Sequence, residues 1–203
     1  MEPDWIDHKI NSARFIQSRL EGMKRVLSIG CGIGIIEKYL FESGVKRLEI
    51  HEVSEEPLHW IRPHFANEAI HIGVLPKCLS SLGKYDYIFL SAIDYGFKEQ
   101  EWAELLMAIK KILNPTGRCL VVSSTFYLSD FYWSELKFWV KFKLKFILSL
   151  FGFYDLGQLV GWRRNLRGFQ SAMVTAGFNI IEEGFLGQDA ILSKTYWIEG
   201  RLA

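Results

Sequence analysis

The feature that most restricts the fold is a run of three closely spaced glycines, Gly30, Gly32 and Gly34, that follows a short apolar stretch. The apolar residues 25–29 predict a buried β-strand, and residues 35–43 have the periodicity of a helix. Because glycine has no Cβ, it permits a sharp reversal and allows a ligand to approach the main chain near the helix start. In α/β sheets, such a turn at the carboxyl edge of the first strand is a place where nucleotides bind.

The spacing of these glycines helps to choose among nucleotide ligands. A dinucleotide-binding turn needs glycine at the position of Ile35, and the Gly-Lys-Ser/Thr of a phosphate loop is absent. Glu52 lies at the end of the second predicted strand, where a carboxylate can accept hydrogen bonds from ribose hydroxyls. The turn, the strand and the acid together favour a nucleoside site. The alternative is a tight structural turn beside a solvated surface glutamate.

The rest of the chain alternates strands and helices, which predicts a mostly parallel sheet covered on both faces. Helices are expected at residues 6–20, 57–66 and 99–113, and strands at 47–53, 69–74, 86–92 and 118–124, with a turn at 114–117. Two closing strands, 178–185 and 191–198, are joined by a loop containing Gly187 and are expected to form an antiparallel edge. We therefore expect one doubly wound α/β domain over residues 1–203, with an insert at 126–162 after the fifth strand.

Four segments carry a resemblance to a known family. They read VLSIGCGIG at 26–34, LEIHEVS at 48–54, YDYIFLS at 85–91 and LNPTGRCLVV at 113–122. In this order and spacing, the chain resembles the class I S-adenosylmethionine-dependent methyltransferases from about residue 24 to residue 198. The resemblance implies a Rossmann-like fold, S-adenosylmethionine as cofactor and an acceptor that receives a methyl group. By matching position, it implies these cofactor-binding residues: Ile29, Gly30, Cys31, Gly32, Gly34, Glu52, Val53, Ser91 and Ala92.

Two departures from the family pattern concern the cofactor. Ser28 stands where the family often has a carboxylate near the methionine ammonium group, and residues 73–78 lack the acid that often contacts adenine. A narrower similarity, carried by SAIDY at 91–95, GQLVGWR at 157–163 and AGF at 176–178, resembles methyltransferases of polysaccharide and glycan biosynthesis. It implies a small-molecule acceptor that is a sugar hydroxyl or a nucleotide- or lipid-linked glycan precursor.

A hydroxyl acceptor would benefit from a general base next to the cofactor, just beyond the fourth strand. Asp94 and Tyr95 lie there, so we expect Asp94 to act as base or to position the acceptor, with Tyr95 as a wall or hydrogen-bond partner. The alternative is that Asp94 only turns or caps the chain before the next helix. Tyr127, Asp130 and Arg163 are secondary candidates, chosen because they flank the insert.

Composition argues against several partners and sites. Twenty-four Lys and Arg against 23 Asp and Glu give a net charge of +1, which argues against a nucleic-acid partner. The five histidines are scattered and the three cysteines form no CxxC pair, so no metal site is expected. The start of the chain is acidic and lacks the apolar core of a signal peptide, which favours a cytoplasmic location.

Aromatic and basic residues dominate the insert between residues 131 and 151. Five charged side chains in this run argue against a membrane span, whereas Lys137, Lys141 and Lys145 would share one face of a helix. This pattern is typical of a lid, a homodimer interface, a helical cap on the sheet, or a peripheral contact at the inner membrane surface. The alternation of residues 141–146 is also compatible with a strand.

Two other functions compete with methyl transfer. One is a nucleoside-binding module without catalysis, which the insert would hold to a membrane or a partner. The other is a nicotinamide-dependent oxidoreductase, against which Ile35 argues because a dinucleotide-binding turn requires glycine there.

Overall fold

The computed structural model describes residues 3–125, 166–189 and 193–203, together with Val140, Lys143, Leu144, Ile147, Leu148, Phe151 and Arg164. The described α-helices are α1 (Pro3–Arg19), α2 (Ile35–Glu42), α3 (Glu99–Ile112) and α5 (Leu166–Thr175). The described strands are β1 (Val26–Ile29), β2 (Leu48–Glu52), β3 (Ile70–Ile72), β4 (Tyr85–Ser91), β5 (Leu113–Thr125), β6 (Phe178–Asp189) and β7 (Ser193–Leu202).

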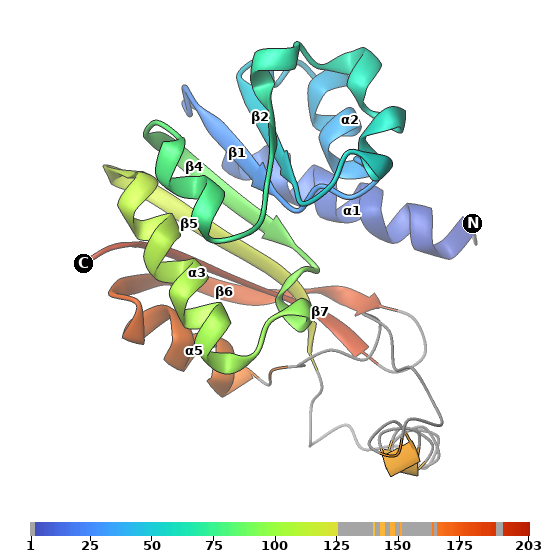
Figure 1. Cartoon of the computed structure of the whole chain (residues 1–203), viewed down its shortest axis with the longest axis vertical. Helices are drawn as coiled ribbons and strands as arrows, with labels where there is room; N and C mark the ends of the chain where they lie inside the picture. The colour runs from blue at the N-terminus through green and yellow to red at the C-terminus, as the bar shows by residue number, and fades with distance from the viewer. Residues whose placement is uncertain are drawn as a thin grey trace.

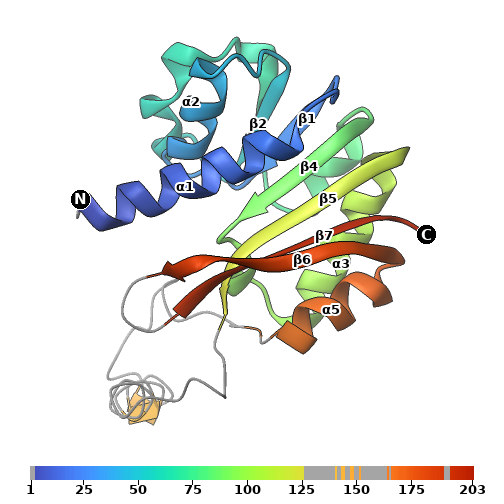
Figure 2. The same ribbon diagram turned by 180° about the vertical axis from the view of Figure 1, so that it is seen from behind.

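These strands form one sheet in the order β3-β2-β1-β4-β5-β7-β6 (Figures 1 and 2). Strands β1 to β5 pair in parallel, and β7 runs antiparallel to both β5 and β6. The predicted doubly wound, mostly parallel sheet with an antiparallel edge is therefore confirmed. The strand order reverses between β1 and β4, and ligands of such sheets bind beyond the carboxyl ends of the strands at this point.

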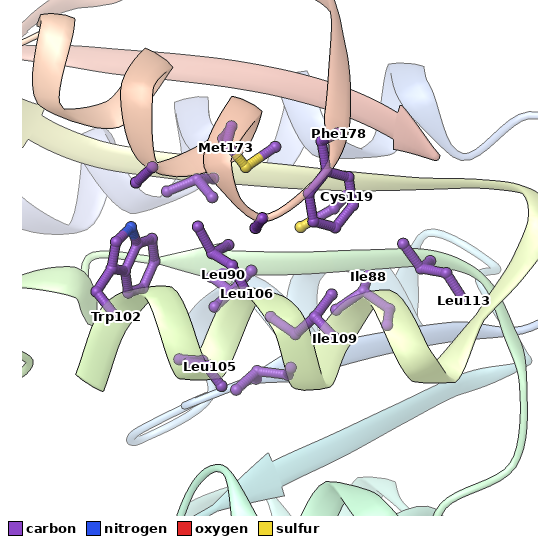
Figure 3. Packing of buried hydrophobic residues seen from close by; sticks show 14 of the residues in the cluster. Ile88, Leu90, Trp102, Leu105, Leu106, Ile109, Leu113, Cys119, Met173 and Phe178 are labelled. Atoms are coloured by element: carbon purple, nitrogen blue, oxygen red, sulfur yellow. The ribbon is translucent and has the colours of Figure 1, made fainter. Parts of the chain in front are cut away.

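Alternating side chains of the strands build one hydrophobic cluster on each face of the sheet. In β1, Val26 joins the cluster beneath α1 and α2, whereas Leu27 joins the cluster beneath α3 and α5. Figure 3 shows the second cluster, in which Trp102 and Ile109 of α3 face Leu90 of β4. Because both faces are packed, the strand ends that carry the site have little freedom to move.

The segment predicted as a helix at 57–66 consists instead of two short 3₁₀ helices, η1 (Glu56–Trp60) and η2 (Arg62–His64). Pro57 is tolerated because the first residues of a helix need no intrahelical N–H donor. Pro63 lies further along, where it lacks the N–H that a continuing α-helix would use. The prediction of one α-helix in this segment was wrong for that reason.

Two predicted turns lie inside strands. Residues 114–117 belong to β5, and its pairing with β4 shifts register between Tyr85 and Tyr87. Gly187 lies inside β6, whose pairing with β7 shifts register between Phe185 and Gly187. In both places an irregularity in the pairing absorbs the turn-forming residues without ending the strand. The closing strands β6 and β7 consequently end later than predicted.

The described apolar residues of the insert are exposed and belong to neither hydrophobic cluster. Their exposed fractions lie between 38% and 70%, and they are Val140, Leu144, Ile147, Leu148 and Phe151. They lie beyond the carboxyl end of β5 (Figure 1), at the spacing of one helix face. The candidates Tyr127, Asp130 and Arg163 and the lysines 137, 141 and 145 lie outside the described residues. None of the described helices combines the length and hydropathy needed to cross a membrane.

Candidate active site

The glycine turn joins β1 to α2, and its glycines have positive φ angles of 73° at Gly30, 56° at Gly32 and 75° at Gly34. A Cβ at Gly30 would lie 2.5 Å from Ile93 Cγ2, and one at Gly34 would overlap the side chain of Ile61. A Cβ at Gly32 would meet no described atom within 4 Å beyond its chain neighbours. Packing therefore requires glycine at Gly30 and Gly34, whereas Gly32 faces open space in which a ligand can approach the main chain.

Glu52 ends β2 beside this turn and is only 8% exposed. Its Oε2 accepts a hydrogen bond from the Gly32 N–H at 2.7 Å, and its Oε1 accepts one from the Val53 N–H at 2.7 Å. A carboxylate has about four lone-pair positions, so further hydrogen bonds, such as those from ribose hydroxyls, can still be accepted. The fold thus brings the predicted acid and the predicted glycine turn together.

Apolar side chains lie at the neighbouring strand ends. Val53 follows β2 and is 54% exposed, and Val74 follows β3 and is 64% exposed. Glu52 pairs with Ile72, so these two strands end side by side. Exposed apolar surface next to a carboxylate suits a flat base joined to a ribose. Val53 was predicted from the family resemblance, whereas Val74 was missed because nothing in residues 73–78 marks a binding residue.

His51 holds two loops of the site against β2. Its backbone carbonyl accepts hydrogen bonds from the N–H groups of Gly30 at 2.9 Å and Cys31 at 3.1 Å. Its Nε2 lies 2.9 Å from Gly73 O and 3.1 Å from Cys78 Sγ. Burial lowers the pKa of His51, so the imidazole is neutral near pH 7. Sequence reasoning missed this residue because it belongs to no motif.

The carboxyl end of β4 supplies Ser91 and Ala92, which are both half-buried. Ala92 has a φ of 56°, which residues other than glycine rarely adopt, and its N–H donates to Val122 O at 2.8 Å. Strained backbone of this kind clusters at binding sites. In the turn, Cys31 is half-buried, and burial raises the pKa of its thiol. The Ile29 side chain is fully buried, so only its main chain can face a ligand.

Asp94 lies in the loop between β4 and α3 and is 1% exposed. Its Oδ1 accepts a hydrogen bond from Ser123 Oγ. Arg164 donates to Asp94 O at 2.8 Å and to Phe97 O at 2.9 Å, and it pairs with Glu99 Oε2 at 3.0 Å. These contacts fix the loop and bury the predicted base within it. The role of Asp94 toward an acceptor stays a prediction.

Ser123 and Arg164 were missed by the sequence analysis because they lie 29 and 70 residues from Asp94. Only the fold brings them together. Tyr95, the other predicted catalytic residue, is half-buried next to Asp94. In the part of the chain that the structure describes, no group of three or more His, Cys, Asp and Glu could hold a metal ion.

The strand order, the glycine turn and the acid at the end of β2 agree with the fold that the resemblance to class I methyltransferases implied. A family model described as a methyltransferase domain matches residues 7–183. The chain therefore belongs to this family of methyltransferase domains. No curated protein sequence matches the chain significantly.

Solved structures share the fold. The mitomycin 7-O-methyltransferase MmcR is 14% identical with a TM-score of 0.68, over 96% of this chain and 54% of MmcR. The magnesium protoporphyrin IX methyltransferase ChlM from Synechocystis PCC 6803, with bound SAH, is 14% identical with a TM-score of 0.65, over 98% of this chain and 86% of ChlM. LepI in complex with SAM is 15% identical with a TM-score of 0.61, over 90% of this chain and 44% of LepI. The chain thus spans about half of the length of MmcR and LepI.

Proposed function

We propose that the chain binds S-adenosylmethionine at the glycine turn and transfers its methyl group to a hydroxyl of a small acceptor. The observation that carries this proposal is the hydrogen bond between Glu52 and the main chain of Gly32, beside the open space in front of Gly32. A carboxylate for the ribose then lies next to backbone that a ligand can approach. Val53 and Val74 offer apolar surface to the adenine. These residues fit a nucleoside with an amino-acid tail.

When bound, S-adenosylmethionine supplies a methyl group that is activated by a positively charged sulfur. The chain has to hold the acceptor oxygen in line with that methyl group and to keep water away. The oxygen–carbon bond forms as the carbon–sulfur bond breaks, and the hydroxyl proton passes to a base. We assign this proton to the carboxylate of Asp94, with Tyr95 beside the acceptor. Ser123 and Arg164 hold the Asp94 loop in the closed arrangement, from which it has to open for this step.

We further propose that the acceptor is a glycan hydroxyl or a lipid-linked glycan precursor. The similarity of residues 91–95 and 157–163 to glycan-modifying methyltransferases supports this class of acceptor. The exposed apolar side chains of the insert support contact with a membrane surface, where a lipid-linked acceptor lies. Four lysines between residues 137 and 145 would add attraction to anionic lipids. Self-association of two chains through the same face is the alternative.

A second candidate function is cofactor binding without methyl transfer. Asp94 is 1% exposed, so its action as a base requires the loop after β4 to open. One structural neighbour is a pericyclic reaction enzyme, which has a TM-score of 0.61 and is 15% identical. This neighbour supports the alternative because a pericyclic reaction is not a methyl transfer.

Calorimetry and a turnover assay test the proposed function together. We expect S-adenosylmethionine and S-adenosylhomocysteine both to bind, and at least one acceptor in a panel of glycans and lipid-linked glycans to be methylated. Binding without methyl transfer over the whole panel would favour the second candidate function. Failure of both ligands to bind would contradict the proposal.

The role of Glu52 can be measured separately. Glu52→Ala is expected to weaken S-adenosylmethionine binding by about 1.5–3 kcal/mol, because hydrogen bonds between the ribose and a charged group are lost. Glu55→Gln is the matched control, since Glu55 is a nearby carboxylate whose side chain is 76% exposed. Calorimetry should show a larger dissociation constant for Glu52→Ala and an unchanged one for Glu55→Gln. An unchanged constant in Glu52→Ala would remove Glu52 from the site.

A further inference from the structure

Glu37 places a buried carboxylate directly beneath the glycine turn. It is the third residue of α2, the helix that begins where the turn ends, and it is 2% exposed. Its Oε1 accepts a hydrogen bond from Ser28 Oγ at 2.5 Å. Ser28 lies on β1, two residues before Gly30. The carboxylate is therefore enclosed between the strand that enters the turn and the helix that leaves it.

A charge at this position is expensive, because its neighbours on the same helix face are the buried side chains of Ile36 and Leu40. Burial raises the pKa of Glu37 to about 7, opposed by hydrogen bonds from Ser28 and its own N–H and by the charge of Lys9. An apolar residue would pack here without this penalty. A carboxylate in such a place is explained if the site receives a positive charge when its ligand binds.

Two other charged groups act on the ionisation of Glu37. Lys9 of α1 favours the ionised form of Glu37, and Glu52 at the end of β2 disfavours it. Glu37 and Glu52 both raise the pKa of the Cys31 thiol, after the larger effect of burial. The negative potential of the two carboxylates therefore reaches the turn itself, where Cys31 lies.

S-adenosylmethionine and its product differ by one methyl group and one positive charge on sulfur. We propose that the carboxylate of Glu37 makes the site sensitive to this charge, so that it favours the sulfonium cofactor over the neutral product S-adenosylhomocysteine. The inference rests on the proposed function, because it requires that both ligands bind at the glycine turn. It adds a reason why the product can be exchanged for new cofactor. After methyl transfer the sulfur is neutral, so the attraction between Glu37 and the ligand is lost.

The test compares the two ligands in Glu37→Gln, which keeps the size of the side chain and can still bond to Ser28. Dissociation constants are measured by calorimetry at pH 8, where Glu37 is mostly ionised. We expect the preference for S-adenosylmethionine over S-adenosylhomocysteine to fall about tenfold, as for the loss of one charge at nanometre range in a protein interior. A purely structural role would weaken both ligands equally, and an equal loss would overturn the inference. Glu42→Gln, an exposed site on the same helix, is the control and should leave the preference unchanged.

Two further measurements keep the inference testable if Glu37→Gln does not fold. In the wild-type chain, the preference for S-adenosylmethionine should rise between pH 6 and pH 8 as Glu37 loses its proton, and a flat ratio would overturn the inference. The double substitution Ser28→Asp with Glu37→Ser moves the carboxylate to the strand side of the same hydrogen bond and should restore the wild-type preference. A low preference in this variant would contradict the inference. If neither ligand binds the wild-type chain, the proposed function itself fails, which calorimetry distinguishes from an unchanged ratio.

Discussion

Gly32 and Gly34 differ in what lies beyond their α-carbons, although both belong to the glycine turn. Gly34→Ala would force a methyl group against Ile61 at a positive φ, and we expect a loss of unfolding free energy of about 2–4 kcal/mol. Gly32→Val would lose about 1–2 kcal/mol of unfolding free energy, mainly because valine disfavours a positive φ. Its side chain would also fill the space in front of the turn. We therefore expect Gly32→Val to fold and to lose S-adenosylmethionine binding. Denaturant unfolding and calorimetry measure the two effects, and retained affinity in Gly32→Val would contradict the site.

The proposed role of Asp94 as the base that takes the acceptor proton can be tested by substitution. If its carboxylate takes the acceptor proton, Asp94→Asn should lower kcat roughly 10²–10⁴-fold, in the range of general base catalysis, with little change in cofactor affinity. Lys98→Ala, an exposed position at the end of the same loop, is the control. A methyl-transfer assay and calorimetry on both variants separate turnover from binding. Normal turnover in Asp94→Asn would show that Asp94 serves only the loop.

The predictable part of the site is the part encoded by neighbouring residues. Glycine spacing and the acid at the end of the second strand are local patterns, and they gave the turn and Glu52. The hydrogen bond between Ser28 and Glu37 could not be foreseen, because it depends on how α2 packs on β1. The contacts of Asp94 with Ser123 and Arg164 depend on segments that are distant along the chain.

At the level of elements, hydrophobic periodicity predicted every strand of the sheet and failed where another rule was stronger. The apolar pattern at 57–66 is helical in spacing, but Pro63 interrupts it, so 3₁₀ helices form. Gly187 is turn-forming in isolation, yet its pairing with Thr195 keeps it in β6, and residues 114–117 form an irregularity of β5 between Leu113 and Arg118, which both pair with β4. Strand pairing is a tertiary interaction, and single-sequence patterns do not contain it.

The exposed apolar side chains of the insert lead to a prediction about membrane binding. We expect the chain to sediment with vesicles of phosphatidylcholine and phosphatidylserine, because apolar burial and lysine charge act together on an anionic surface. Lys143, which is exposed next to Leu144, would repel its counterpart in a dimer through this face. Leu144→Glu combined with Ile147→Glu should abolish sedimentation, since both side chains are exposed on that face. Val174→Glu, at an exposed position on α5, is the control.

Vesicle binding that survives the double substitution would contradict this role of the insert. A second contradicting result would be that the wild-type chain does not bind vesicles but forms a dimer, and that the same substitutions dissociate this dimer in light-scattering measurements. The second result would assign the apolar face to self-association.

For the molecule as a whole, the sheet separates a site at the carboxyl ends of the strands from an ionic network near their amino ends. Glu49 is the centre of this network. It accepts hydrogen bonds from Arg25 Nε at 2.5 Å and Tyr85 OH at 2.7 Å, and it lies 2.7 Å from His71 Nε2. The network connects the strands β2, β3 and β4 and the residue before β1. It therefore contributes to the stability of the sheet.

The stability due to Glu49 should depend on pH. Burial opposes ionisation, but hydrogen bonds from His71, Arg25 and Tyr85 lower the pKa of Glu49 to about 2, from 4.5 in the unfolded chain. The contribution is therefore complete above about pH 4.5 and is lost as pH falls toward 2. We expect Glu49→Gln to lose about 1–2 kcal/mol at pH 7, a value reduced for solvent screening, and less at pH 3. Urea unfolding at both pH values measures the difference, and a deficit that is independent of pH would contradict this account.

The most direct test of the central claim is a crystal structure of the chain soaked with S-adenosylhomocysteine. We predict density for the nucleoside across the glycine turn, with the ribose hydroxyls donating to Glu52 and the amino-acid end above the Glu37 side of the turn. A structure that shows the ligand elsewhere, or the space in front of Gly32 filled by the protein's own side chains, would contradict it.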